Sequence, residues 1–339
     1  MRKPDREKLR YLDRIWRRRH YRLRAKPRRR VRPHARGQVL QSQTLNVYAP
    51  AEFDLTIEPN RSTLLAFLDK ILQALKDGHK VQICFDATKK LQPSGTLYFV
   101  AIIDSILSNF PGQLSCNYPE DEVVEQLFQH INFLQRLGKS PRKTITADNV
   151  RYWQYLGGTT VDLSGFKDLF EKISLENDTK AGLYDGFTEA ITNVIQHAYS
   201  DIKDNQDVIA CKWWMFAQLR NAQLDITICD LGMGIPKSML IKPEVSEIIM
   251  RVVARFKKRH HNALIEVAVE SNRSRTKLAH RGKGLPDMLK FARTSEIGSF
   301  MIHSQKGFFI CDPKHVERGH DYRRPITGTL IHWRIPISE

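Results

Sequence analysis

Apolar and polar positions along the chain switch between the period of a strand and the period of a helix, in an order that predicts an α/β protein. Between residues 52 and 140, short apolar runs typical of strands are separated by longer segments with helical spacing. The predicted strands cover residues 53–57, 80–86 and 113–116, and the predicted helices cover residues 61–77, 96–109 and 120–135. This alternation indicates a small α/β domain over residues 52–140.

The second half of the chain carries a stronger strand pattern that is followed by glycines. Leu224, Ile226 and Ile228 occupy alternate positions and predict a strand that ends at Asp230. Further patterns predict a strand over residues 330–335 and helices over residues 243–258, 262–270 and 285–294. Pro286 falls in the first turn of the last of these helices, where proline is tolerated.

Three polar residues spaced by four, Glu189, Asn193 and His197, line one face of a predicted helix. A carboxylate beside an amide oxygen suits Mg²⁺, a hard cation that takes only one or two protein ligands besides phosphate oxygens. Asn193 is then the direct ligand, and Glu189 is the group that orients or deprotonates an attacking water or hydroxyl. The alternative is an ordinary amphipathic helix whose polar face meets solvent.

Asp230 ends the predicted strand and is followed by Gly232 and Gly234. Glycines after a strand allow positive φ and let a ligand approach the backbone closely. A carboxylate at this position can accept a hydrogen bond from an exocyclic amine, which would distinguish adenine from guanine. The alternative is a tight turn, because Asp and Gly are common turn residues.

The stretch Arg281, Gly282, Lys283, Gly284 and Leu285 opens the helix predicted over residues 285–294. A glycine-rich entry to a helix N-terminus offers free N–H groups and a favourable dipole to an anion, and the two basic residues add positive charge. The stretch is not a P-loop, because the chain contains no G-x-x-x-x-G-K-[ST] sequence.

Taken in order, and closed by Gly328-Thr329 before the strand over residues 330–335, these stretches resemble the four motifs of the GHKL ATPase superfamily. That superfamily includes gyrase, the heat-shock chaperone, histidine kinases and mismatch-repair ATPases. The resemblance covers residues 150–338 and implies a GHKL domain over residues 150–339, a two-layer α/β sandwich of the Bergerat type that binds ATP and Mg²⁺.

The resemblance also implies a role for each motif residue. Glu189 would be the catalytic base, Asn193 would hold Mg²⁺ and Asp230 would recognise adenine. The remaining nucleotide contacts would come from His197, Gly232, Gly234, Arg281, Gly282, Lys283, Gly284, Leu285 and Thr329.

Within the superfamily, the sequence around Glu189 and Asn193 is closest in style to the anti-sigma-factor serine kinases. The chain departs from them in a long lid over residues 235–281, which carries the helices predicted over residues 243–258 and 262–270. Segments of this kind close over a nucleotide and exclude water. Basic residues of the lid, Arg273, Arg275 and Lys277, either meet the terminal phosphate or form a solvated basic loop.

The smaller domain over residues 52–140 resembles the STAS domain of anti-sigma-factor antagonists. A strand ending in Asp86 is followed by a loop with Ser94-Gly95 that opens a helix, and Ser94 takes the place of the serine that is phosphorylated in that family. Gln92-Pro93 replaces the acidic residue that usually precedes the serine. Ser94 is therefore either a phosphoacceptor or an ordinary helix N-cap.

Composition narrows the broad class of protein. A chain of 339 residues with 41% hydrophobic and 27% charged residues is typical of a soluble protein with about two domains. No apolar run reaches the roughly 18 residues of a membrane helix, and no secretory signal is apparent. Five scattered cysteines without a C-x-x-C pair argue against disulfides and zinc, so we expect a cytoplasmic protein.

The positive charge of the chain is concentrated in its first 37 residues. Residues 1–37 hold 17 Lys or Arg and three acids, a net charge of +14 out of +17 for the whole chain, and residues 38–51 follow as a linker. This tail, disordered or an amphipathic helix, suits a polyanion, and its Tyr11, Trp16 and Tyr21 could stack on bases. Three interpretations are open: nucleic acid binding, an anionic membrane surface, or a solvated tail that docks a protein partner.

Two classes of function follow from these features. In the first, a GHKL enzyme transfers phosphate to Ser or Thr of a protein partner or hydrolyses ATP as a regulatory switch, with the STAS-like domain as regulator or substrate. In the second, a non-catalytic ATP-gated binding protein moves its basic tail onto nucleic acid. The intact Glu189 favours the enzyme, and the long lid and basic tail favour the binding protein; a homodimer is one possible assembly for either.

Overall fold

The computed structural model of the chain describes residues 43–151, 153–160, 177–199, 212–220, 222–241, 260–270, 284–294 and 298–337. The basic tail over residues 1–37, the helix predicted over residues 243–258 and the lid residues Arg273, Arg275 and Lys277 lie outside these ranges. None of the helices that the structure does describe is long and apolar enough to cross a membrane.

Residues 44–151, which we call the N-terminal module, are built on a parallel sheet of three strands in the order β1-β3-β5. The strands are β1 (Thr44–Tyr48), β3 (Lys80–Cys84) and β5 (Leu114–Cys116), with a short pair β2 (Glu52–Phe53) and β4 (Lys90–Leu91) beside them. The helices are α2 (Asn60–Lys76), α3 (Pro93–Asn109), α4 (Glu122–His130), α5 (Phe133–Arg136) and α6 (Asp148–Arg151).

The predicted elements of this module are present, with three corrections. The segment predicted as a linker, residues 38–51, contributes β1 to the sheet, where only Val47 is fully buried because β1 is an edge strand. The strand predicted over residues 53–57 is confined to the two residues of β2. The helix predicted over residues 120–135 is divided into α4 and α5 because Asn132 adopts a left-handed conformation with φ 56°.

The second part of the described chain is an antiparallel sheet of seven strands in the order β11-β10-β9-β12-β8-β7-β6. Its strands are β6 (Trp153–Gly158), β7 (Trp213–Arg220), β8 (Gln223–Asp230), β9 (Ser299–Ser304), β10 (Gly307–Cys311), β11 (Glu317–Asp321) and β12 (Thr329–Pro336). The chain is thus an α/β protein, as its pattern predicts, and both the strand expected to end at Asp230 and that expected over residues 330–335 are present.

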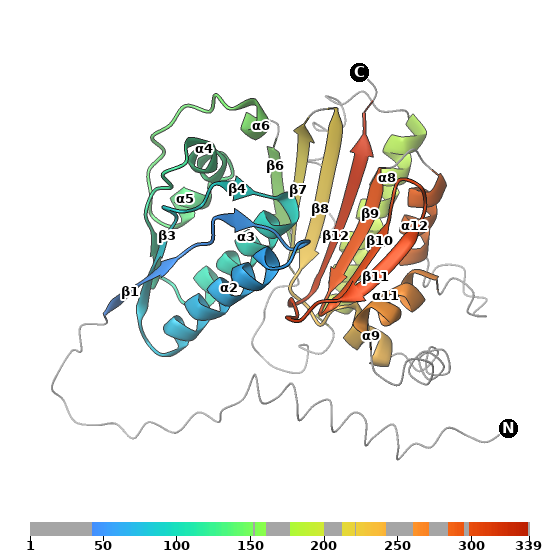
Figure 1. The fold of residues 1–339 in the computed structure, drawn as a ribbon, viewed down its shortest axis with the longest axis horizontal. Coiled ribbons are helices and arrows are strands. Elements are labelled where there is room, and N and C mark those ends of the chain that lie inside the picture. Colours follow the sequence, from blue (N-terminus) through green and yellow to red (C-terminus); the bar gives the residue numbers. More distant parts are fainter. Residues whose placement is uncertain are drawn as a thin grey trace, which may run out of the picture. The chain divides into compact units, whose positions relative to one another are not determined.

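One face of this sheet is covered by α8 (Asn177–Asn193), the π-helical turn η1 (Val194–Ala198), α9 (Ile235–Ile241), α11 (His261–Glu270) and α12 (Gly284–Thr294) (Figure 1). Their apolar side chains pack on alternate strand residues, such as Met215 and Ile226. The Phe187 ring of α8 meets the Trp333 ring of β12 edge to face, with centroids 5.3 Å apart.

The opposite face of the seven-stranded sheet packs against α3 of the N-terminal module. Trp214 and Phe216, which alternate with the residues that face α8, belong to the same apolar cluster as Leu97 and Phe99 of α3. Residues 97–101 of α3 are at most 3% exposed, as expected of a helix covered on all sides. Residues 42–339 accordingly form one compact unit.

A partly buried carboxylate fixes α3 to the sheet. Asp104 of α3 accepts hydrogen bonds from the indole N–H of Trp214 and the ammonium of Lys212, both at 2.9 Å, and pairs with Arg136. Burial alone would raise the pKa of Asp104, but Arg136, Trp214 and Lys212 outweigh it and hold the pKa below its usual value. The ionised carboxylate therefore links α3, α5 and β7 at neutral pH.

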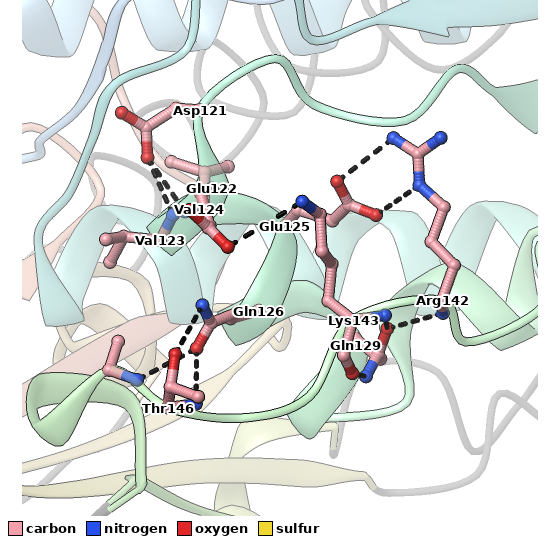
Figure 2. A network of polar contacts seen from close by, with 11 residues as sticks. Asp121, Glu122, Val123, Val124, Glu125, Gln126, Gln129, Arg142, Lys143 and Thr146 are labelled. Atoms are coloured by element: carbon pink, nitrogen blue, oxygen red, sulfur yellow. Dashed lines mark hydrogen bonds and ion pairs between the residues drawn. The ribbon is translucent and has the colours of Figure 1, made fainter.

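Residues 142–147, which lead out of the N-terminal module, are held against α4 by three of its polar side chains, Glu125, Gln126 and Gln129 (Figure 2). The amide oxygen of Gln126 accepts the backbone N–H groups of Thr146 and Ala147 at 2.8 and 2.9 Å, and its amide nitrogen donates to the Thr146 hydroxyl at 3.2 Å. Gln129 binds the backbone of residues 142–143, and Glu125 pairs with Arg142. Gln126 and Gln129 thus satisfy backbone groups that have no strand partner, and Glu125 adds an ion pair to the Arg142 side chain.

We expect Gln126→Ala to lower the free energy of unfolding by about 2 to 3 kcal/mol, since three hydrogen bonds of a buried side chain are lost. Gln135→Ala on neighbouring α5 is the matched control, because Gln135 is exposed, and it should change stability by less than about 0.5 kcal/mol. Urea unfolding of both variants measures the difference, and equal stabilities would contradict the structural role of Gln126.

Candidate functional site

The structure brings Asp230 and Gly328 into direct contact, although they are far apart in the sequence. Thr329 lies opposite Asp230 in the β8–β12 register, and a Cβ on Gly328 would lie 1.9 Å from the Asp230 carbonyl oxygen. Gly328 also has φ +79°, so no other residue fits this position without strain. The second and fourth of the predicted motifs therefore form one corner of a site.

The Asp230 side chain is buried and oriented by backbone donors. It is 5% exposed and accepts the Gly232 N–H at 2.7 Å, and the Thr329 N–H also binds it. Burial raises the pKa of this carboxyl to about 7 even though both N–H groups oppose the shift. Asp230 thus presents a carboxyl group whose position is fixed by the loop that follows it.

Two residues that the sequence patterns did not single out connect this corner. The Ser304 hydroxyl, at the end of β9, accepts the Ile235 N–H at 2.9 Å and lies 3.0 Å from both the Gly328 carbonyl oxygen and the Thr329 hydroxyl. The Gln305 amide donates to the Met233 carbonyl at 3.0 Å. The only sequence signal for them is a run of three polar residues, His303 to Gln305, directly after the apolar run over residues 300–302.

Helix α8, which carries the predicted metal ligand Asn193, contacts the third motif at Gly284. A Cβ on Gly284, the first residue of α12, would lie 2.3 Å from Oε1 of Glu189 and 2.7 Å from Nδ2 of Asn193. The N-terminus of α12 therefore adjoins the carboxylate and the carboxamide of α8. A larger residue at position 284 would require the Glu189 and Asn193 side chains to move.

Glu189 is half-buried, and its environment changes its acidity. Burial raises the pKa of this carboxyl, and the negative charge of nearby Asp287 raises it further. A carboxylate with a raised pKa is a stronger base once it is ionised, as proton abstraction from water or a hydroxyl requires.

The helix face predicted from Glu189 through His197 changes its winding after Asn193. Residues Val194–Ala198 form the π-helical turn η1, and the His197 side chain is exposed at this turn. The end of η1 contacts the Asp230 loop, because the Ala198 carbonyl accepts the Met233 N–H at 2.7 Å. Single π turns of this kind occur frequently at functional sites.

Close packing at Gly232 and Gly234 completes the junction of the motifs. A Cβ on Gly232 would lie 2.2 Å from the Ala198 carbonyl oxygen, and a Cβ on Gly234 would lie 2.8 Å from the Ser304 hydroxyl. Gly234 also has φ +78°. Leu285, one residue into α12, is partly buried against the apolar cluster on the helical face of the sheet.

The remaining predicted residues of the third motif, Arg281, Gly282 and Lys283, lie outside the described residues. The structure thus brings together Glu189, Asn193 and Gly284 at one end of the site, and it joins Asp230, the two glycines that follow it and Thr329 at the other.

The side chains of Glu189 and Asn193 fit a hard cation that is bound partly by the protein and partly by phosphate oxygens. Within the described part of the chain, no three or more His, Cys, Asp or Glu side chains gather as a metal site. Mg²⁺ does not require such a cage, since it keeps water and phosphate oxygens and takes one or two protein oxygens. The Glu189 carboxylate and the Asn193 carboxamide both lie beside Gly284, and these two groups contain oxygen atoms of this type.

Ser94 belongs to the N-terminal module, in the first turn of α3. Helix α3 begins at Pro93 with Gln92 in the N-cap position, so the alternative interpretation of Ser94 as an N-cap is wrong. The Ser94 side chain is 3% exposed, and a Cβ on Gly95 would lie 2.4 Å from the Phe53 carbonyl oxygen. A kinase would reach Ser94 only if the start of α3 separated from β2.

Gly328→Ala should destabilise the protein by more than about 4 kcal/mol, because backbone atoms of Asp230 occupy the space that the methyl group needs. Gly112→Ala is a matched control, since Gly112 has φ +72° but no atom within 4 Å of an added Cβ, and we expect it to cost only about 1 to 2 kcal/mol of backbone strain. Denaturant unfolding compares the two variants, and similar losses would contradict the close approach at Gly328.

The raised pKa of Asp230 makes the stability of the protein depend on pH. The folded state binds this proton more tightly than the unfolded chain, so between about pH 4 and pH 7 the carboxyl contributes a loss of stability as pH rises, and the loss levels off above its pKa of about 7. We expect Asp230→Asn to remove this slope. Unfolding free energies at half-unit pH steps test it, and parallel curves for both proteins would contradict the raised pKa.

Comparisons with known proteins leave the functional argument to this geometry. No protein-family model matches the chain, and no curated protein matches its sequence. What supports a function is therefore the arrangement of residues itself, in which glycine positions place Asp230, Gly328 and Thr329 at one end and Glu189, Asn193 and the α12 N-terminus at the other.

Proposed function

We propose that the chain binds ATP and Mg²⁺ at this site and transfers the terminal phosphate to Ser or Thr of a protein partner or to water. The observation that carries the proposal is the close approach of Gly284 to Glu189 and Asn193. There a helix N-terminus meets a carboxylate with a raised pKa and a carboxamide, both on another helix and both close enough to meet a Cβ at position 284.

The phosphate end of the site would be formed by α8 and α12. The free N–H groups and dipole at the start of α12 favour an anion, and the Glu189 carboxylate and the Asn193 carboxamide lie next to them. Bound Mg²⁺ would neutralise charge on the phosphates. Glu189 would accept the proton of the attacking hydroxyl or water.

The base end of the site would be formed by Asp230. Its buried carboxyl, held by the N–H groups of Gly232 and Thr329, can accept a hydrogen bond from the exocyclic amine of adenine, whereas guanine presents a carbonyl at that position. A buried acceptor that is left unpaired is costly, so this arrangement would discriminate between the two bases.

The architecture supports a GHKL-type domain. Helices lie on one face of an antiparallel sheet. The motifs contact one another in pairs: Gly284 adjoins Glu189 and Asn193 of α8, Gly328 rests on Asp230, and Ala198 of η1 lies against Gly232. The parallel three-stranded sheet and flanking helices of the N-terminal module support a STAS-like regulator or substrate. Likeness to the anti-sigma-factor serine kinases rests on the sequence around Glu189 and Asn193.

The charge distribution favours a second candidate function, an ATP-gated protein with little turnover whose tail contacts nucleic acid. Residues 1–37 carry a net charge of +14, which suits phosphate neutralisation on a polyanion. The raised pKa of Glu189 favours catalysis over this alternative, because a protein that only binds nucleotide gains nothing from a base.

Incubation of the full chain with Mg²⁺ and γ-labelled ATP tests the proposal. We expect Glu189→Gln to lower phosphate transfer about 10²- to 10⁴-fold, the usual contribution of a general base, and Asn193→Ala to lower it through loss of the metal ligand. Glu266→Gln is the matched control, because Glu266 is also a half-buried helical carboxylate whose pKa is raised by burial, and it should leave transfer unchanged.

The position of the label distinguishes the reactions. Label on the protein that is lost in both Glu189→Gln and Ser94→Ala indicates a serine kinase acting on its own N-terminal module, and free phosphate without protein label indicates an ATPase switch. Nucleotide binding without either product favours the ATP-gated binding protein. Absence of nucleotide binding would contradict the site as a whole.

A further inference from the structure

The turn between β9 and β10 is held by the N-terminal module as well as by the candidate site. Arg61, in the first turn of α2, is 0% exposed, and its guanidinium donates to the carbonyls of Leu55, Gln305 and Arg324 at 2.9, 3.5 and 3.4 Å. It also lies 4.0 Å from the centroid of the Tyr322 ring. One buried side chain of α2 thus binds three segments, two of which belong to the seven-stranded part.

The partners of Arg61 are neutral, which is unusual for a buried cation. Besides the carbonyls, its guanidinium lies 3.4 Å from Nδ1 of His303, whose pKa is far below its usual value because of burial and then the charge of Arg61. A cation placed at such a cost must be compensated by the contacts that it makes. Its position is therefore set by the carbonyls of Leu55, Gln305 and Arg324 and by the His303 ring.

Gln305 connects this contact to the candidate site. Its carbonyl accepts from Arg61 and from the Ile326 N–H, the latter at 2.9 Å, while its side chain donates to the Met233 carbonyl between Gly232 and Gly234. Its neighbour Ser304 binds Ile235 and Gly328. A displacement of this turn would therefore move the backbone that surrounds Asp230.

A second side chain of the N-terminal module holds the other loop of the site. The buried hydroxyl of Tyr98, in α3, accepts the Thr327 N–H at 2.9 Å, directly before Gly328. Gly328 in turn rests on the Asp230 backbone. Arg61 and Tyr98 thus reach, from α2 and α3, the two loops that frame Asp230.

We propose that Tyr98 and Arg61 are positioning residues for the nucleotide site, so that the N-terminal module sets ATP affinity and the choice of base by holding the loops around Asp230. This rests on the proposed function of the site. Neither residue lies among the four motifs. A partner that displaced α2 or α3 would regulate nucleotide binding through these two contacts.

Tyr98→Phe tests the proposal, because it removes one hydroxyl and keeps the ring that packs in the core. We expect ATP affinity, measured with a fluorescent ATP analogue and by competition with ATP and GTP, to fall about three- to tenfold, the equivalent of one hydrogen bond. The preference for ATP over GTP should fall as well. Tyr118→Phe is the matched control. The Tyr118 hydroxyl also makes one hydrogen bond, to the Ser140 carbonyl at 2.9 Å, but this bond does not involve the loops around Asp230.

Two further readouts make the outcomes decisive. A loss of ATP and GTP affinity by the same factor would indicate less folded protein and overturn the proposal, as would affinities equal to those of the wild type. In the absence of nucleotide, backbone hydrogen exchange over residues 322–332 should be faster in Tyr98→Phe than in the wild type. Unchanged exchange would overturn the positioning role of Tyr98, and this holds even if the wild type binds no nucleotide. If the wild type binds no nucleotide, the proposed function fails on that measurement alone, separately from the positioning role of Tyr98.

Discussion

The burial of α3 between two sheets is the constraint on which the rest of the described structure depends. Residues 97–101 are covered on all sides, so the N-terminal module and the seven-stranded sheet share one apolar core. An amphipathic helix could slide on a single sheet, but a helix packed on both sides has one position. Asp104 adds a directional tie, because its ionised carboxylate joins α3 to Lys212, Trp214 and Arg136.

The two faces of the seven-stranded sheet pack against different parts of the chain. Alternate residues of β7 send Met215 toward the helices that carry the candidate site and Phe216 toward α3. On this face α3 packs against β8, which ends at Asp230, and against β12, which begins at Thr329. The contacts of Tyr98 and Arg61 lie at the edge of the same interface, where strands give way to loops.

The local patterns of the sequence predicted the fold class, most elements of the N-terminal module and the strand that ends at Asp230. They did not single out β7, because Trp213–Arg220 is buried on both faces and shows no alternation of apolar and polar residues. The glycines of the motifs were predictable as sites of close approach, since glycine after a strand is a local signal. Arg61, Tyr98 and Ser304 were not, because their importance arises from partners more than 20 residues away in the sequence.

The candidate site concentrates features that cost stability, and the shared core explains how the fold tolerates them. A buried carboxyl with a pKa of about 7, two glycines with positive φ and a buried arginine with neutral partners all surround the same pair of loops. In a sheet covered on one face only, such loops would relax away from these conformations. Here α2 and α3 hold them from the other face, so the N-terminal module is part of the physical basis of the site. Coupling between two sites is reciprocal, so if α2 and α3 set nucleotide affinity as proposed, a nucleotide bound beside Asp230 strengthens the contact between the sheet and the N-terminal module to the same extent.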